Sequence, residues 1–183
     1  MIRVDVAQTL LQRELRQSRP FESPAHEAVL NLLRTADCLR RRIAEVVEPR
    51  GVTAQQYNVL RILRGAGATP LPTLDIADRM VEQAPGVTRL LDRLEAKRLV
   101  TRQRCATDRR QVLCRITPAG LSLLADLDAP VRRANAAALG GLTVASQRQL
   151  IRLLERVRAG SMGGLEGCRP RGAADVTGTR PPA

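Results

Sequence analysis

The sequence predicts a mainly α-helical protein that carries one small β-hairpin. Leu, Ala and Arg are abundant, whereas the aromatic residues are one Phe and one Tyr, with no Trp. This composition favours helices because Leu, Ala and Arg lose little side-chain freedom in them. Apolar residues recur at helical spacing along most of the chain, but between residues 99 and 116 they alternate with polar ones, as in paired strands.

The N-terminal part predicts one short and one long helix. Residues 1–24 form an extension, which includes a short amphipathic helix within residues 2–17. A long helix follows over residues 25–48, because apolar residues recur there at helical spacing until Pro49 and Gly51 stop it. The apolar side of the short helix consists of Val6, Leu10 and, as further candidates, Leu11 and Leu15.

Residues 53–116 are predicted to form a lobe that begins with three helices. Thr53 and Gln56 have the spacing of a capping box, which fixes the start of the first helix. Two shorter helices begin at Thr73 and Pro85 around a tight turn, and the second carries its charges on the outer face, the pattern of a helix-turn-helix. The residues expected to face the core are Tyr57, Leu60, Leu63, Leu74, Ala77, Val87, Leu90, Leu91 and Leu94, with Ile76 and Met80 as further candidates.

The predicted hairpin is strongly basic. Seven basic residues and one acid lie from Lys97 to Arg115, so this segment carries half of the net charge of +12. This indicates a polyanionic partner, because a basic hairpin can lie along phosphates or enter a narrow minor groove of DNA; the alternative is a solvated turn. The acid, Asp108, is expected to orient an arginine or to cap the turn. Cys105 and Cys114 are expected on opposite faces of the hairpin, where they cannot form a disulfide.

The second helix of the helix-turn-helix offers candidates for base contacts. Thr88 and Arg89 lie near its start, where a recognition helix reaches furthest into the major groove, and Arg93 follows on the outer face. Arg can pair bidentately with guanine, while Thr can contact a thymine methyl group or a phosphate. The alternative is an ordinary surface helix with paired charges, such as Asp92 with Arg89 or with Lys97.

Two further helices are predicted over residues 118–158. Thr117 precedes a proline, a pair that suits a helix start, and Pro130 is a candidate kink. Thr143 starts the last helix. Residues 159–183 are rich in Gly and Pro and lack apolar periodicity, so we expect a disordered tail. The expected buried stripes are Leu121, Leu124, Leu127 and Val131 in the first helix and Leu150, Leu153, Leu154 and Val157 in the second.

The sequence argues against several other classes of site. The four cysteines lack metal-ligand spacing and His26 is the single histidine, so no metal site and no cofactor are expected. One histidine, no CxxC pair and no glycine-rich phosphate loop leave no catalytic constellation, so an enzyme is not expected. Acidic residues interrupt the N-terminal apolar residues and no apolar run is long enough to span a membrane, which predicts a cytoplasmic protein with reduced thiols.

The segments "LPTLDIADRM" and "GVTRLLDRLEAKRLVTRQRCATDRRQVLCRITPAG" strongly resemble the MarR (multiple antibiotic resistance regulator) family of bacterial transcription factors. The resemblance covers residues 25–158. It implies a winged helix-turn-helix in which residues 53–116 form the DNA-binding lobe and residues 25–48 and 118–158 are dimerisation helices. It further implies a homodimer that binds a pseudo-palindromic operator in double-stranded DNA, more often as a repressor than as an activator.

Family positions carried onto this chain give the expected roles of single residues. The resemblance places Asp108 and Arg110 in the family's D-x-R wing motif, with Asp108 orienting and Arg110 inserted in the minor groove. Arg109 is expected to contact a phosphate nearby, and Pro85 to help set the entry of the recognition helix. One departure is Arg98, which stands where the family often has glycine. If that position needs a positive φ, arginine is strained there; otherwise the helix end is made differently.

The resemblance also implies a small aromatic or phenolic effector bound between the dimerisation helices and the DNA-binding lobe, or an oxidant-sensing cysteine. Arg34, Arg41 and Tyr57 are the candidate effector ligands, near the predicted helix junctions. Neighbouring arginines favour a reactive Cys38, but a buried and inert Cys38 fits better, because sensing members of the family use a cysteine nearer the N-terminus with tyrosine partners. The alternative function is a winged helix for protein–protein contact or for redox sensing through Cys38.

Overall fold

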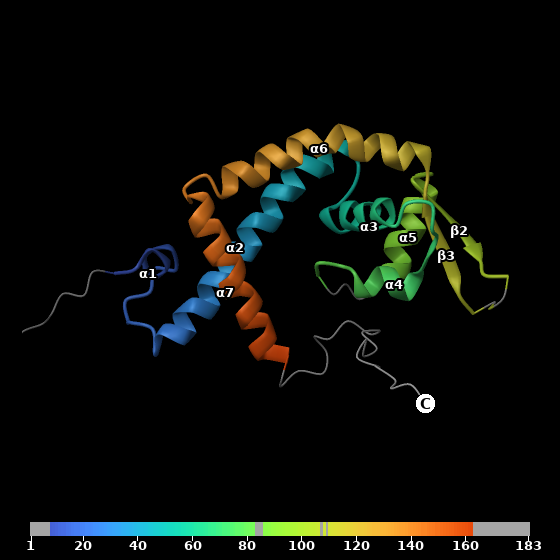
Figure 1. Cartoon of the computed structure of the whole chain (residues 1–183). Helices are drawn as coiled ribbons and strands as arrows, with labels where there is room; N and C mark the ends of the chain where they lie inside the picture. The colour runs from blue at the N-terminus through green and yellow to red at the C-terminus, as the bar shows by residue number, and fades with distance from the viewer. Residues whose placement is uncertain (1–7, 83–85, 107, 109, 163–183) are drawn as a thin grey trace, which may run out of the picture. The chain divides into compact units, whose positions relative to one another are not determined.

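The protein is mainly helical with a small antiparallel sheet, as the sequence predicts (Figure 1). The computed structural model describes residues 8–82, 86–106, 108 and 110–162. The chain divides into two compact units, residues 1–43 and 44–183. The elements are α1 (Leu10–Glu14), α2 (Pro24–Val47), the 3-10 helix η1 (Glu48–Arg50), α3 (Ala54–Gly65), β1 (Leu71–Pro72), α4 (Thr73–Asp78), α5 (Val87–Ala96), β2 (Val100–Arg104), β3 (Val112–Ile116), α6 (Pro118–Ala138) and α7 (Val144–Met162).

In the first unit, α1 is shorter than the helix predicted within residues 2–17. Thr9 and Gln12 form a capping box, in which each side chain accepts the backbone N–H of the other residue. The helix stops before Arg16 because that residue adopts a left-handed conformation, with φ of 51°. Of the side chains predicted on the apolar side, Leu11 is buried, Leu10 and Leu15 are exposed, and Val6 lies outside the described residues.

The predicted long helix is confirmed as α2. Ser23 caps it, since its hydroxyl accepts the backbone N–H of His26 at 3.1 Å. All residues of α2 are described, and among them Val47 alone is buried. The helix therefore leaves apolar side chains uncovered in the single chain, namely Val29, Leu32, Leu33 and Leu39.

In the second unit, α3 contacts α4, α5, α6 and β3. The capping box at its start is confirmed: the Gln56 N–H donates to the Thr53 hydroxyl and the Thr53 N–H to the Gln56 side chain, at 3.2 and 3.1 Å. Tyr57, Leu60 and Leu63 are buried, as predicted. Figure 1 shows α6 passing over α3, with α4 and α5 on the other side of α3.

The helix-turn-helix consists of α4 and α5, with two corrections to the sequence prediction. Leu74 is 73% exposed, because it lies in the first turn of α4 on the side away from the fully buried Ile76. α5 begins at Val87, two residues later than predicted, since Gly86 precedes it with a left-handed φ of 98°. Residues 83–85 lie outside the described residues. The buried residues of α5 are Val87, Leu91 and Leu94.

The predicted hairpin is confirmed as β2 and β3, in the sheet order β1-β3-β2. Arg102 pairs with Cys114, and the Cys105 N–H donates to the Gln111 carbonyl at 3.0 Å, which is the register that the sequence predicts. The third strand, β1, is missing from the prediction, because two residues that include Pro72 are too short to show alternation.

α6 begins where the sequence predicts. The Thr117 hydroxyl accepts the Gly120 N–H at 3.1 Å, and the helix runs through Pro130. Leu121 is 43% exposed, contrary to the prediction. The reason is that Gly120 packs inward instead: a Cβ on it would lie 2.5 Å from the Leu99 carbonyl oxygen. The predicted stripe is otherwise buried, at Leu124, Leu127 and Val131.

The last helix, α7, extends to Met162, beyond the predicted start of the tail at residue 159. Leu150 and Leu154 are half-buried, whereas Leu153 and Val157 are exposed. The predicted disorder of residues 163–183 lies outside the described residues. Within the part of the chain that the structure describes, none of the helices has the length and apolarity needed to cross a bilayer.

Candidate nucleic-acid interface

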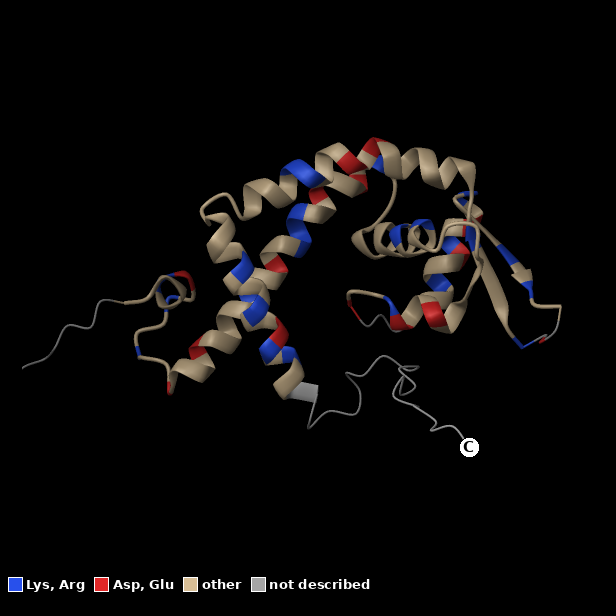
Figure 2. Ribbon diagram, viewed as in Figure 1, with Lys and Arg blue, Asp and Glu red and all other residues tan. Residues whose placement is uncertain are grey.

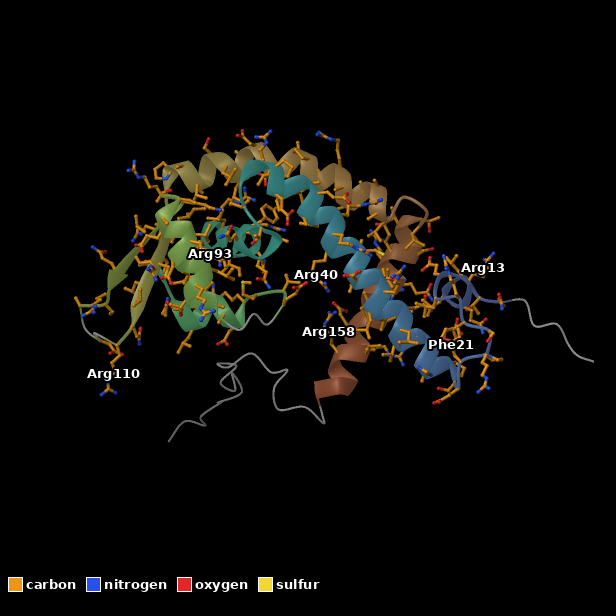
Figure 3. The ribbon with its side chains drawn as sticks, turned by 180° about the vertical axis from the view of Figure 1, so that it is seen from behind. Arg13, Phe21, Arg40, Arg93, Arg110 and Arg158 are labelled. Atoms are coloured by element: carbon orange, nitrogen blue, oxygen red, sulfur yellow. The ribbon has the colours of Figure 1, made fainter. Side chains whose placement is uncertain are left out.

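The outer face of α5 carries three of the predicted contact residues. Thr88, Arg89 and Arg93 are exposed, while the opposite face of the helix is buried against the lobe. Figure 3 shows Arg93 on this helix. Since the first two lie in the first turn, the structure presents them at the end that a recognition helix inserts into a groove. Pro85, the predicted entry residue, lies outside the described residues.

The tip of the hairpin is shaped by Asp108. Its carboxylate accepts the backbone N–H of Arg110 at 3.0 Å, and its carbonyl accepts the N–H of Gln111 at 2.9 Å. Of the two roles considered from the sequence, the carboxylate thus caps the turn. The Arg110 side chain is exposed and lies at the end of the hairpin, pointing away from the lobe (Figure 3). Arg109 lies outside the described residues.

Arg102 joins the hairpin to α5. Its guanidinium lies 2.7 Å from Asp92 Oδ1, and its Nε and Nη2 donate to Glu95 Oε2 at 2.8 and 2.7 Å. The hydrogen bond with Glu95 is the main cause that raises the pKa of Arg102 above its ordinary value. Asp92 therefore pairs with Arg102. The pairs of Asp92 with Arg89 or Lys97, which the sequence leaves open as an alternative, are not formed among the described residues. Lys97 Nζ instead donates to the Gly51 carbonyl and the Gln56 side chain.

This role of Arg102 is not predicted from the sequence, where Arg102 is one of the seven basic residues of the hairpin segment. A signal was nevertheless present. Strand alternation puts Arg102 on the same side as Val100, which is buried, and Asp92 and Glu95 are three residues apart and so share one face of α5. Figure 2 shows further Lys and Arg positions in blue along α5 and the hairpin strands.

Arg98 adopts the strained conformation, which is one of the two alternatives that the sequence leaves open. Its φ is 58°, in the left-handed region. The Arg98 carbonyl accepts the Thr117 hydroxyl at 2.8 Å, and the Leu99 carbonyl accepts the Thr117 N–H at 3.1 Å. Thr117 thus holds the strained turn between α5 and β2 while it also caps α6.

The predicted effector ligands already have partners in the described structure. Arg34 pairs with Glu14 at 3.5 Å, and Arg41 pairs with Asp37 at 2.9 Å. Tyr57 belongs to the second unit, is 6% exposed, and has the Arg61 guanidinium 5.9 Å from its ring centre. The first two lie seven residues apart on α2 and share a face of that helix.

The cysteines differ from the prediction at one position. Cys38 is exposed rather than buried, and its sulfur lies 3.8 Å from the Arg41 guanidinium. Burial raises the pKa of the Cys114 thiol, and Cys105 lies three pairs further along the hairpin, on the opposite face. Among the described residues, no group of three or more His, Cys, Asp or Glu side chains could hold a metal ion.

Comparison with known proteins identifies the family. The MarR family model matches residues 52–112. The chain is 43% identical to a MarR transcription factor from Planctomyces limnophilus, over 74% of this chain and 98% of that one, with a TM-score of 0.59. BpsR from Bordetella bronchiseptica, whose DNA binding is regulated by 6-hydroxynicotinic acid, is 25% identical over 72% and 98% of the two chains, with a TM-score of 0.64.

A further similarity concerns the fold alone. Sco3205 from Streptomyces coelicolor, a MarR family transcriptional regulator solved in complex with DNA, is 19% identical over 79% of this chain and 92% of its own, with a TM-score of 0.68. The similarity supports the winged helix arrangement described above. The match at 43% identity over 74% of the chain, together with the family model, shows that this chain belongs to the MarR family of transcriptional regulators.

Proposed function

We propose that the chain acts as a homodimer that binds a pseudo-palindromic operator in double-stranded DNA and represses transcription. The observation that carries this proposal is the arrangement around Arg102. The exposed start of α5 and the basic tip of the hairpin belong to one lobe, and Arg102 joins the two elements through Asp92 and Glu95. Such a lobe can contact a major groove and the adjacent minor groove together.

In the major groove, Thr88 and Arg89 read base edges. Their exposure in the first turn of α5 supports this, because a guanidinium there can pair with guanine and a threonine can contact a thymine methyl group. Arg93, one turn further along, contacts a phosphate, and Pro85 sets the approach of the helix. These contacts give the sequence preference of the protein.

In the minor groove, Arg110 is the inserted residue. Support comes from its exposed position at the hairpin tip and from the Asp108 cap, which fixes the backbone that carries it. Arg109 contacts a neighbouring phosphate. A narrow minor groove has the most negative potential of the DNA surface, so a guanidinium at this tip gains affinity there.

Homodimerisation is supported by apolar side chains that the single chain leaves uncovered. They lie on α2 and on α7, which are among the helices that the family resemblance implies for dimerisation. Monomers seldom expose so many large apolar residues, and a second copy with two-fold symmetry covers the same surface on both chains. The residues are Val29, Leu32, Leu33 and Leu39 on α2 and Val144, Ile151, Leu153 and Val157 on α7.

A small aromatic acid or phenol is the proposed effector that releases the DNA. The regulation of BpsR by 6-hydroxynicotinic acid supports this class of molecule. Arg34, Arg41 and Tyr57 are its proposed ligands. Because both arginines pair with carboxylates in the described structure, an effector carboxylate would replace Glu14 or Asp37 as the partner of a guanidinium.

The experiment that tests this function is selection of bound duplexes from a random DNA library, followed by measurement of the mass of the complex by sedimentation. The proposal predicts enrichment of an inverted repeat and two chains on each duplex. Enrichment of no sequence, or one chain per duplex, would contradict it.

A further inference from the structure

A bidentate ion pair ties α3 to α6. Arg64 Nη1 donates to Asp128 Oδ2 and Arg64 Nη2 donates to Asp128 Oδ1, both at 2.9 Å. The two residues are 64 positions apart in the chain. Two parallel hydrogen bonds between planar groups fix both the distance and the angle between their helices, which a single contact cannot do.

A second, looser ion pair lies at the other end of α3. Arg50, in the 3-10 helix before α3, lies 3.6 Å from Asp126, whereas Arg64 is next to the last residue of α3, which is about 18 Å long. Asp126 and Asp128 stand on either side of the buried Leu127, each about 100° around α6 from it. The two pairs therefore tie α3 at both ends and on both sides of its contact with α6.

The apolar contact between these helices does not fix their orientation in this way. Leu60 and Leu63 of α3 and Leu124 and Leu127 of α6 are buried. Burial of apolar area is non-directional, and ridges of side chains can pack into neighbouring grooves at several angles. The leucines hold the helices together, and the ion pairs select one angle between them.

The charge distribution keeps the Arg64 pair intact at neutral pH. The hydrogen bond from Arg64 is the largest cause that lowers the pKa of Asp128, and the charges of Arg132 and Arg61 act in the same direction. The hydrogen bond with Asp128 likewise raises the pKa of Arg64. Both pKa shifts favour the charged forms of the two partners at neutral pH.

We propose that Arg64 and Asp128 are positioning residues, which hold the winged helix lobe at one orientation on α6 and thereby set the operator spacing that the protein accepts. The inference rests on the proposed function, because the separation of two recognition helices has a meaning only in a dimer. Neither residue contacts DNA in this proposal. The pair acts through the angle between α3, which carries the lobe, and α6.

Operator spacing is a sensitive readout of that angle. One inserted base pair moves a half-site by about 3.4 Å and turns it by about 34° around the duplex. A lobe held at one angle cannot follow such a change without breaking contacts. Without the ion pair, the lobe is held by the leucine contact and by Thr117 and Gly120 at the start of α6, and it can adapt to the insertion at a smaller cost.

The first measurement needs no DNA. Spin labels at Thr101 on β2 and Arg133 on α6, in a variant without other cysteines, report the distance between lobe and helix within one chain. Labelled protein is diluted with unlabelled protein so that distances between chains do not contribute. We expect one narrow distance distribution for the parent and a broader one for Arg64→Gln and Asp128→Asn. An unchanged, narrow distribution in both variants overturns the proposal, whatever the DNA results.

The second measurement uses a duplex selected by the wild-type protein, with none or one base pair inserted between its half-sites. We expect the insertion to weaken wild-type binding about tenfold, as a mismatch does, and to weaken Arg64→Gln binding by less than about threefold. Arg61→Gln is the matched control, since it removes the same charge from α3 without breaking either hydrogen bond of the ion pair, and it should retain the wild-type discrimination. The double variant Arg64→Asp with Asp128→Arg exchanges the two charges. It should restore the wild-type discrimination between the duplexes with and without the inserted base pair.

Three results overturn the proposal in distinct ways. Equal discrimination in wild type and Arg64→Gln, with only a lower melting temperature, makes the pair a stabilising contact and nothing more. Loss of discrimination in Arg61→Gln as well makes net charge the cause. If the wild type selects no inverted repeat, the proposed function fails, and the label distances still report on the pair by themselves.

Discussion

Arg102 and Glu95 are joined by two hydrogen bonds to one oxygen: Nε and Nη2 of the arginine donate to Oε2 of the glutamate at 2.8 and 2.7 Å. The contact links the strand β2 to the helix α5, so the two elements that are proposed to face DNA are held together. Arg102, although it lies in a basic hairpin, thus forms ion pairs within the protein. The exposed arginines around it remain accessible to phosphates.

This relationship predicts different effects for two arginines of the same hairpin. Arg102→Gln should lower the affinity for a selected duplex about fivefold to tenfold, because the loss of a partly exposed ion pair is worth about 1 kcal/mol, and should leave the salt dependence unchanged. Arg110→Gln should reduce the slope of log affinity against log salt by about 1, as for a direct contact with the DNA. Fluorescence anisotropy at several salt concentrations measures both. Equal slopes for the two variants would contradict the assignment of Arg102 to an internal ion pair and of Arg110 to a direct contact with DNA.

The close packing around Gly120 predicts that even a substitution by alanine destabilises the fold strongly. In Gly120→Ala the new Cβ would lie 2.5 Å from the Leu99 carbonyl oxygen and 2.7 Å from Cγ1 of Ile116, so the start of α6 must shift. We expect the free energy of unfolding to fall by about 2 kcal/mol, a typical cost of overpacking. Gly65→Ala is the control, since nothing lies within 4 Å of its Cβ, and it should not destabilise. Urea unfolding of the two variants decides, and similar stabilities would contradict the prediction.

The backbone strain at Arg98 predicts that its replacement by glycine stabilises the protein. Its φ of 58° strains any residue with a Cβ, so Arg98→Gly should raise the free energy of unfolding by about 1 kcal/mol. Arg98→Ala loses the same charge but keeps the strain, and should therefore leave the stability close to that of the parent. If both variants gain equally, the charge of Arg98 is the cause and the strain argument fails. Thermal and urea unfolding provide the comparison.

The ion pair of Asp128 predicts a contribution to the free energy of unfolding that depends on pH in the acid range. Its pKa in the folded protein is lower than the ordinary 3.8, so the ion pair stabilises the fold above the unfolded pKa, and this contribution is lost as the pH falls through the folded pKa. The difference in unfolding free energy between wild type and Asp128→Asn should be constant above about pH 5, at most about 1 kcal/mol for so exposed a pair, and should shrink below about pH 4. Urea unfolding from pH 3 to 7 measures it. Arg64→Gln should show the same profile, and a difference that grows in acid would contradict the assignment.

The burial of Cys114 predicts that its thiol is protected from alkylation in the folded protein. It is fully buried and burial raises its pKa, so few molecules carry the reactive thiolate. A variant that keeps Cys114 as its single cysteine should react with iodoacetamide only when the protein unfolds. A variant that keeps only Cys105, which is partly exposed at the end of the hairpin, should react at least about tenfold faster. Equal rates in the folded protein would show that the hairpin opens readily.

The sequence predicts best those features that depend on neighbours in the chain. The capping box of Thr53 and Gln56, the Thr117 cap and the pairing of Arg102 with Cys114 each follow from a local pattern, and each is confirmed. The family position of Arg98 raises a positive φ as one of two alternatives, and the structure decides for it. Local rules suffice here because a cap or a strand register depends on residues only a few positions apart.

Features that depend on tertiary packing escape the sequence. Leu74 and Leu121 fit a helical stripe but are exposed, because Ile76 and Gly120 take the inward positions. The pair of Arg64 with Asp128 spans 64 residues, and nothing in the pattern connects them. Of the predicted contact residues, the structure presents Thr88, Arg89, Arg93 and Arg110 at the surface of the lobe, but their contacts with DNA remain predictions.

The affinity ratio between a selected duplex and a scrambled duplex of equal length tests the central claim most directly, when it is measured for the wild type and for Arg89→Ala at one salt concentration. If α5 reads bases through Arg89, the ratio should fall about tenfold or more in this variant, since one bidentate contact to guanine gives about 1–3 kcal/mol of discrimination. Arg148→Ala, on the exposed surface of α7, should leave the ratio unchanged. An unchanged ratio in Arg89→Ala would contradict the account of α5 as the recognition helix.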